Sequence, residues 1–103
     1  MGAETGPEQA HHHFQKGYAA QMQGDLDAAI EYYTRSIEIM PTAEAHTFRG
    51  YEPRHYPYFN LSRVYVKQGK IQEAIAEIKV ALELEPGYVV ARKELHRLLG
   101  MLN

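Results

Sequence analysis

The sequence predicts an all-α protein built from two antiparallel helix hairpins and a C-terminal capping helix. Two segments, 24–41 and 69–86, align with each other without a gap. Each opens with a glycine, which suits a tight turn, and closes with a proline, which cannot continue a helix. Between them, apolar side chains recur at helical spacing. A further helical stretch precedes each glycine, so each segment forms the second helix of a helix–turn–helix unit.

The elements follow in a simple order along the chain. The expected helices of the hairpins flank Gly24 and Gly69, and the last helix carries its own apolar stripe. Between the hairpins we expect a short helix over 43–50 and then an extended turn set by Pro53 and Pro57. The predicted boundaries are 1–7 for a disordered N-terminus, 8–41 for the first hairpin, 42–54 for an irregular connection with that short helix, 55–88 for the second hairpin and 89–103 for the capping helix.

The second unit carries a specific motif. It reads Tyr58-x2-Leu61-Ser62-x2-Tyr65-x3-Gly69-x4-Ala74-x6-Ala81-x4-Pro86, and the first unit has matching residues at Gly17, Gly24, Ala29, Ser36 and Pro41. The chain therefore resembles the tetratricopeptide repeat family, as a shortened array of bacterial type. The resemblance implies stacked helix pairs, a fragment of a right-handed α-solenoid, with a concave face used for binding.

Small residues fall where the two helices of each hairpin come closest. Gly17 is expected to meet Ala29, and Ser62 to meet Ala74. Close approach of two helices needs small side chains at the contact. The register of both hairpins depends on these two pairs.

The spacing of the two units departs from the family. Matched residues lie 45 apart, because Gly24 pairs with Gly69, whereas the family repeats every 34 residues. The additional residues lie between Thr42 and Tyr56. They are either the scar of a deletion that fused two repeats or an inserted functional loop.

Composition narrows the function. The chain has 103 residues and a net charge of −2, so bulk charge does not favour nucleic acid or a membrane surface as a partner. It has no cysteine, and no apolar run is long enough to span a bilayer. His11, His12 and His13 are adjacent, and adjacent helical residues point about 100° apart, which does not suit a single metal ion. We expect no catalytic residues, metal or cofactor, and a cytoplasmic protein.

The resemblance implies that the first helix of each hairpin lines the concave face. Some family members hold a partner's C-terminal carboxylates with five residues. Asn60, Lys93 and Arg97 stand at three of those places, while Phe14 and Tyr18 replace the expected lysine and asparagine. His11, Lys67 and Glu94 map to the same helices. The predicted groove residues are Phe14, Tyr18, Gln21, Tyr56, Phe59, Asn60, Arg63, Lys93 and Arg97.

Two functions follow from this reading. The first is a scaffold that binds a protein or peptide partner in the concave groove. The second is self-association, because two repeats leave apolar helix faces uncovered, and a homodimer would cover them. Such a dimer includes the case in which the C-terminal hairpin is exchanged across the connection.

Overall fold

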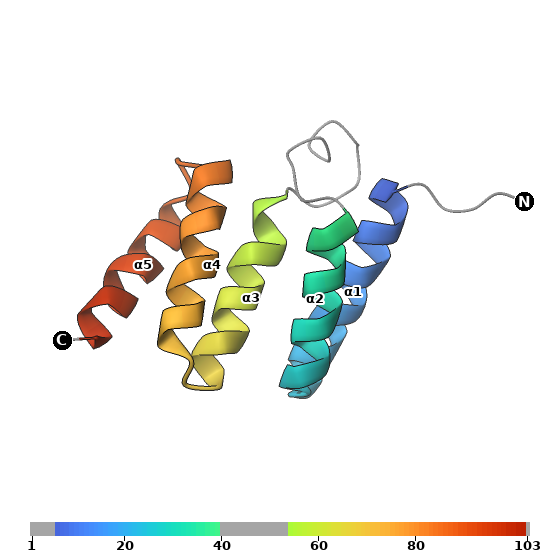
Figure 1. Ribbon diagram of the computed structural model, residues 1–103, viewed down its shortest axis with the longest axis horizontal. Helices are drawn as coiled ribbons and strands as arrows, with labels where there is room; N and C mark the ends of the chain where they lie inside the picture. The colour runs from blue at the N-terminus through green and yellow to red at the C-terminus, as the bar shows by residue number, and fades with distance from the viewer. Residues whose placement is uncertain (1–5, 40–53, 103) are drawn as a thin grey trace, which may run out of the picture.

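The computed structural model describes residues 6–39 and 54–102, and every regular element within these ranges is an α-helix (Figure 1). The prediction of an all-α fold is confirmed. Pro41, Pro53 and the predicted short helix over 43–50 lie outside the described residues. The helices are α1 (Gly6–Gln23), α2 (Leu26–Ile39), α3 (His55–Lys67), α4 (Ile71–Leu84) and α5 (Val89–Met101).

Two expectations that involve a proline are wrong. Residues 6 and 7 were expected to be disordered, but α1 begins at Gly6 and contains Pro7. Pro57 was expected in an extended turn, but α3 begins at His55, so Pro57 lies in its first turn. The first backbone N–H groups of a helix have no acceptor within that helix, and proline, which lacks this group, therefore fits there without losing a hydrogen bond.

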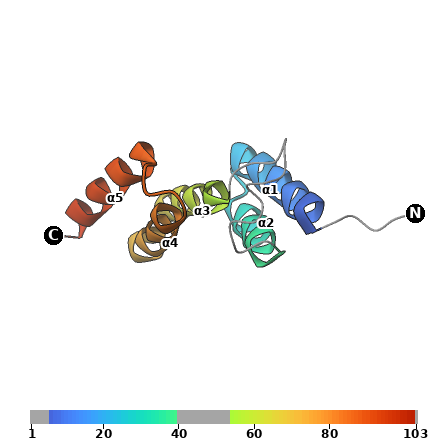
Figure 2. The ribbon, with the colours of Figure 1, turned by 90° about the horizontal axis from the view of Figure 1, so that it is seen from above.

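The helices form two hairpins and a cap. Helix α1 packs on α2, α3 packs on α4, and α2 and α3 join the hairpins, while α5 packs on α4. Seen from above, α1, α3 and α5 lie along one side of the array and α2 and α4 along the other (Figure 2). The first helices of successive units therefore present one common face, as the repeat pattern predicted.

The same turn closes both hairpins. Gly24 and Gly69 have positive φ angles of 83° and 77°, a conformation that side chains disfavour. After Gly24, the N–H of Asp25 donates to the carbonyl of Ala20 at 2.9 Å. After Gly69, the N–H of Lys70 donates to Tyr65 at the same distance. This is the Schellman arrangement, which satisfies the last carbonyls of a helix.

Small residues lie where the helices of each hairpin meet, as the sequence indicated. Ser62 Oγ donates to the carbonyl of Ala74 at 2.8 Å, which confirms that pair. Gly17 is different, because the atoms nearest to its missing side chain belong to the ring of Tyr33. A Cβ at Gly17 would lie only 2.7 Å from Tyr33 Cδ1. The absent side chain thus makes room for this ring, one turn beyond the predicted contact at Ala29.

The other structural positions of the repeat are mostly buried. Ser36 Oγ donates to the carbonyl of Ala10 at 2.7 Å, which gives the first hairpin a second close contact. Tyr65 is partly buried, and Pro86 is exposed in the turn before α5. The buried positions are Gly17, Ala29, Ser36, Leu61, Ser62, Ala74 and Ala81.

Polar contacts connect the hairpins at both ends of α2 and α3. Arg54, only 1% exposed, precedes α3 and donates from Nη2 to the carbonyl of Ser36 at 3.1 Å. That carbonyl lies in the last turn of α2, where the helix dipole favours a positive charge. At the opposite end of the two helices, Gln68 donates to Asp27 at 3.0 Å. Arg54 was not recognised in the sequence.

Helix α5 covers the end of the array. Ala91 and Leu98 are fully buried, whereas five other apolar residues between 44% and 59% exposed remain at its surface. These are Val89, Val90, Leu99, Met101 and, just beyond the helix, Leu102. Of the helices that the structure describes, none is both long and apolar enough to cross a membrane.

Candidate functional site: a two-part groove along α1, α3 and α5

The common face of α1, α3 and α5 carries two hollows that share the ring of Phe59. The first, here called the aromatic cup, has a volume of about 320 Å³. Its walls come from α1, from α3 and from the turn before α5, and no charged residue lines it. The cup is lined by Phe14, Tyr18, Tyr56, Phe59, Asn60 and Tyr88.

The rings of the cup hold one another in place. Tyr88 packs edge-on against Phe59, with ring centroids 5.2 Å apart, and against His55 at 4.7 Å. Tyr56 lies 6.2 Å from Tyr88. Such tilted and edge-on pairs are the arrangements that aromatic rings prefer. Burial raises the pKa of Tyr88, and the neighbouring Tyr56 adds to this while Arg63 opposes it. Tyr88 therefore keeps its hydroxyl proton at neutral pH.

A short polar network lies beside the cup. The Tyr33 hydroxyl donates to Gln21 Oε1 at 2.5 Å and accepts from Asn60 Nδ2 at 3.3 Å. Burial raises the pKa of Tyr33 to about 12, although the hydrogen bond from Asn60 opposes the shift. The network orients the Asn60 carboxamide in the wall of the cup. Gln21, predicted to line the groove, instead serves this network and lines neither hollow.

The second hollow, here called the cationic hollow, has a volume of about 300 Å³ and lies between α3 and α5. The Arg63 guanidinium sits over the Phe59 ring, 5.8 Å from its centroid, which favours a cation–π contact. Among the described residues, neither Arg63 nor Lys67 makes an ion pair. The hollow is lined by Phe59, Arg63, Val66, Lys67, Val90, Glu94 and Arg97.

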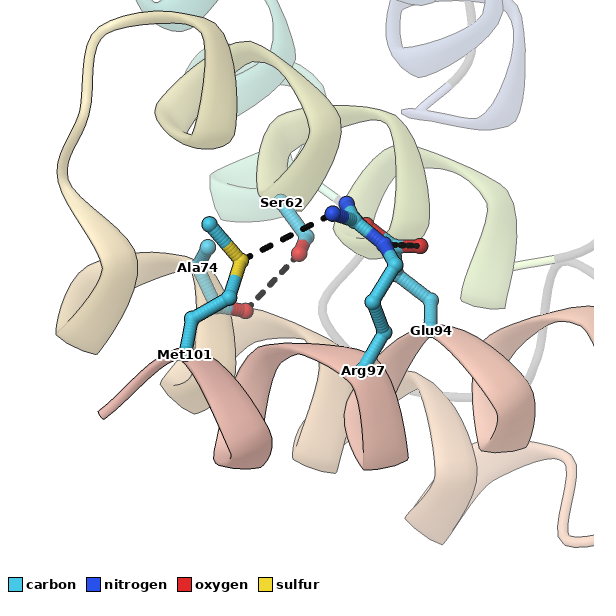
Figure 3. Close-up of polar contacts among 5 residues, drawn as sticks. All are labelled: Ser62, Ala74, Glu94, Arg97 and Met101. Atoms are coloured by element: carbon cyan, nitrogen blue, oxygen red, sulfur yellow. Dashed lines mark hydrogen bonds and ion pairs between the residues drawn. The ribbon is translucent and has the colours of Figure 1, made fainter. Parts of the chain in front are cut away.

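Arg97 already has a partner in this hollow. Its Nη2 and Nε atoms contact the two carboxylate oxygens of Glu94 at 2.5 and 3.1 Å, and its Nη1 lies 3.6 Å from the sulfur of Met101. Figure 3 shows the guanidinium between Glu94 and Met101. The hydrogen bond with Glu94 and the charge of its carboxylate raise the pKa of Arg97 above its ordinary value. Arg97 therefore enters the groove as half of an ion pair.

None of these hollows contains all three of the residues that match the family's carboxylate-binding set, Asn60, Lys93 and Arg97. Asn60 lines the aromatic cup and Arg97 the cationic hollow. Lys93 lies instead in a separate shallow hollow with Arg92, His96 and the flank of Arg97. Asn60 is therefore separate from the other two, whereas Arg97 lines both the cationic hollow and the hollow that contains Lys93.

Three groove residues were missed in the sequence. Tyr88 follows Pro86 and Gly87 in the turn before α5, and a tyrosine directly after such a turn was the available signal. Val66 and Val90 form apolar parts of the cationic hollow. Valines in amphipathic helices carry no signal that separates a groove from a core. Among residues 6–39 and 54–102, no cluster of three potential ligands could hold a metal ion.

Comparison with known protein families identifies the repeat. The sequence model of the tetratricopeptide repeat matches residues 9–43 and 55–88, which is most of the chain and coincides with the two hairpins. The chain belongs to the tetratricopeptide repeat (TPR) family. The segment between the two matches contains most of the additional residues that separate the repeats.

Curated TPR-containing relatives also match. The chain is 36% identical to sperm-associated antigen 1 of Rattus norvegicus and of Mus musculus. Both alignments cover 76 residues, or 74% of this chain. The Homo sapiens protein is 35% identical over 77 residues. The chain spans only about 7% of the length of these relatives. All three are mammalian, so they do not confirm the predicted bacterial type.

A solved structure of a TPR protein also matches the chain. It is described as the first TPR of Spaghetti (RPAP3) bound to the HSP90 peptide SRMEEVD. It is 23% identical to this chain, with a TM-score of 0.46 over 98% of both chains.

Proposed function

We propose that this TPR module binds an extended peptide segment of a partner protein in the groove formed by α1, α3 and α5. The observation that carries the proposal is the pair of adjoining hollows, one aromatic and uncharged, the other cationic, which share Phe59. Large rings bury apolar surface at little cost in conformational entropy, and they are enriched among residues that dominate binding. On this proposal the module acts by binding and not by catalysis, and it does so in the cytoplasm.

The charge distribution favours an acidic ligand. Helix α3 carries Arg63 and Lys67 and no acidic residue, and α5 carries three basic residues and one glutamate. On the other side of the array, α2 and α4 each carry three acidic residues and one basic residue. An acidic segment is therefore attracted to the groove and repelled by the opposite face.

The geometry sets the spacing within the ligand. Phe59, Arg63 and Lys67 follow one another by single turns of α3, so about 12 Å separates the first from the last at 1.5 Å per residue. An extended peptide advances about 3.3 Å per residue. The ligand is therefore a segment with one large apolar residue in the cup, followed about two to four positions later by acidic residues or a free carboxylate.

The test is a titration with a labelled peptide of this design. We expect Arg63→Ala/Lys67→Ala to weaken binding about tenfold at low salt, because charge-assisted hydrogen bonds are lost, and by much less at high salt, where the charges are screened. Arg35→Ala/Lys79→Ala is the matched control, since it removes the same charge from the exposed surfaces of α2 and α4.

Two further peptides separate the hollows. One has amides in place of the acidic groups and the other has serine in place of the apolar residue, and each should bind more weakly than the parent. Equal affinity of both double variants for the parent peptide would show that the groove cations play no part.

Self-association is the alternative function, and the exposed apolar residues of α5 favour it. Val89, Leu99 and Leu102 lie at the open end of the array, each at least 44% exposed. A second copy could cover this end, directly or by exchange of the C-terminal hairpin. Sedimentation at micromolar concentration would then show a dimer, whereas a monomer at the highest attainable concentration would remove this alternative.

A further inference from the structure

The only described anion in the cationic hollow is Glu94, and it lies among three cations. Its carboxylate engages Arg97 through two hydrogen bonds, in the two-pronged geometry that arginine otherwise offers to a ligand carboxylate (Figure 3). The side chain of Glu94 is only 20% exposed, whereas that of Arg97 is 53% exposed. The Glu94 carboxylate is thus the more shielded partner of the pair, and the guanidinium remains reachable from outside.

This contact exists without any partner. Glu94, Arg97 and Met101 follow one another on α5 at spacings of three and four residues, which places them on one face of the helix. The thioether of Met101 contacts the other side of the guanidinium. All three contacts are local to α5, so they require neither a partner nor another helix. An incoming carboxylate therefore meets Arg97 in its paired state.

We propose that Glu94 acts as an internal competitor for Arg97 and thereby determines which acidic ligands the groove accepts. This inference rests on the proposed function of the groove. A ligand carboxylate beside α3 finds Arg63 and Lys67 available, because neither makes an ion pair among the described residues. A ligand carboxylate beside α5 must displace Glu94 and is also repelled by its charge. The groove therefore prefers acidic residues along α3 and discriminates against a further acidic group at α5.

The proposal is tested by changing Glu94 alone. Glu94→Gln keeps the shape of the side chain, removes its charge and frees the guanidinium. We expect a peptide with one apolar and several acidic residues to bind this variant about threefold to tenfold more tightly than the parent protein. Glu83→Gln makes the same change of net charge on the exposed surface of α4 and should leave the affinity within about twofold.

A double-mutant cycle separates competition from simple repulsion. If Glu94 competes for Arg97, the gain from Glu94→Gln should be at least about threefold larger with Arg97 present than in an Arg97→Ala background. An equal gain in both backgrounds would mean that Glu94 acts only through its charge, and it would overturn the proposal.

The outcome also distinguishes this inference from the function beneath it. If the parent protein binds the peptide, and Glu94→Gln binds it no more tightly than Glu83→Gln does, the proposal that Glu94 competes for Arg97 is refuted. The proposal that the groove binds peptides is then retained. If none of the proteins binds the peptide, the proposed groove function fails as well. Thermal unfolding of each variant checks that α5 remains folded.

Discussion

Replacing Tyr33 with alanine should lower the free energy of unfolding by about 3–5 kcal/mol, as is typical when a large buried ring is removed. Tyr33 is fully buried, and its ring occupies the space left by the missing side chain of Gly17. The ring of Phe14 packs on it at 5.5 Å. A loss of this size is a large part of the roughly 5–15 kcal/mol that stabilises a small domain, so the variant should be partly unfolded at 37 °C.

Chemical denaturation followed by circular dichroism measures this effect, and the neighbouring tyrosine provides the control. Tyr32 lies on the same helix but is partly exposed and packs only at the edge of the core, with its ring beside His13 and Lys16. Tyr32→Ala should therefore cost only about 1 kcal/mol. Equal losses in the two variants would contradict the packing of Tyr33 against Gly17.

A milder substitution isolates the hydroxyl. Tyr33→Phe keeps the ring but leaves Gln21 and Asn60 without their shared partner. It should cost about 1–2 kcal/mol, which is what an unsatisfied, partly buried hydrogen bond typically costs. Because Asn60 belongs to the cup, the same variant should also weaken peptide binding, although its fold is retained.

Removal of two exposed rings should have the largest effect on binding. We expect Tyr18→Ala/Tyr56→Ala to lower the affinity for the acidic peptide by at least about 30-fold. Aromatic anchors at the centre of an interface typically contribute about 2 kcal/mol or more. Tyr18 is 50% exposed and Tyr56 is 39% exposed, so both rings can be removed without creating a cavity in the core. Unlike the two hollows along α5, their cup is lined by no charged residue.

Met22→Ala is the control for this experiment. Met22 is 63% exposed on α1, one turn beyond Tyr18, and it does not line the cup. Isothermal titration should find its affinity within about twofold of the parent protein. Undiminished binding by the double tyrosine variant would mean that the peptide does not enter the cup, and it would favour another surface of the module.

The fold could be predicted because its determinants are local. A glycine in a left-handed turn, a proline beyond a helix and apolar residues at helical spacing each act within a few neighbouring residues. The Ser62–Ala74 contact followed from the need for small residues between close helices. Gly17 was assigned correctly to such a contact, but its neighbour is Tyr33, since the size of a ring one turn away cannot be inferred from spacing alone.

The groove could be predicted only in part. Phe14, Tyr18, Tyr56, Phe59 and Asn60 do line one cup, because positions on the first helix of each repeat share a face. Tyr88 was missed because its direction depends on the turn between α4 and α5. Lys93 was expected beside Arg63, but it lines a neighbouring hollow on α5 that it shares with Arg97. Arg97 does line the cationic hollow, but it is paired there with Glu94, and this pairing was not predicted. Arg54 is buried and donates to Ser36 of the other hairpin, a contact that no local pattern reveals.

Each helix of this array packs mainly on its neighbours in the sequence, and this has a consequence for how the chain folds. Such a chain behaves as a row of coupled units, whose stability is a sum of unit terms and interface terms, and whose mostly local contacts permit fast folding. Either end can therefore open while the rest persists. A peptide bound to α1, α3 and α5 would contact both hairpins and the cap at once. It would therefore couple the stability of the two ends of the array, which make no strong direct contact with each other. Occupied and empty protein would then differ in cooperativity, with hydrogen exchange suppressed most strongly at the two ends.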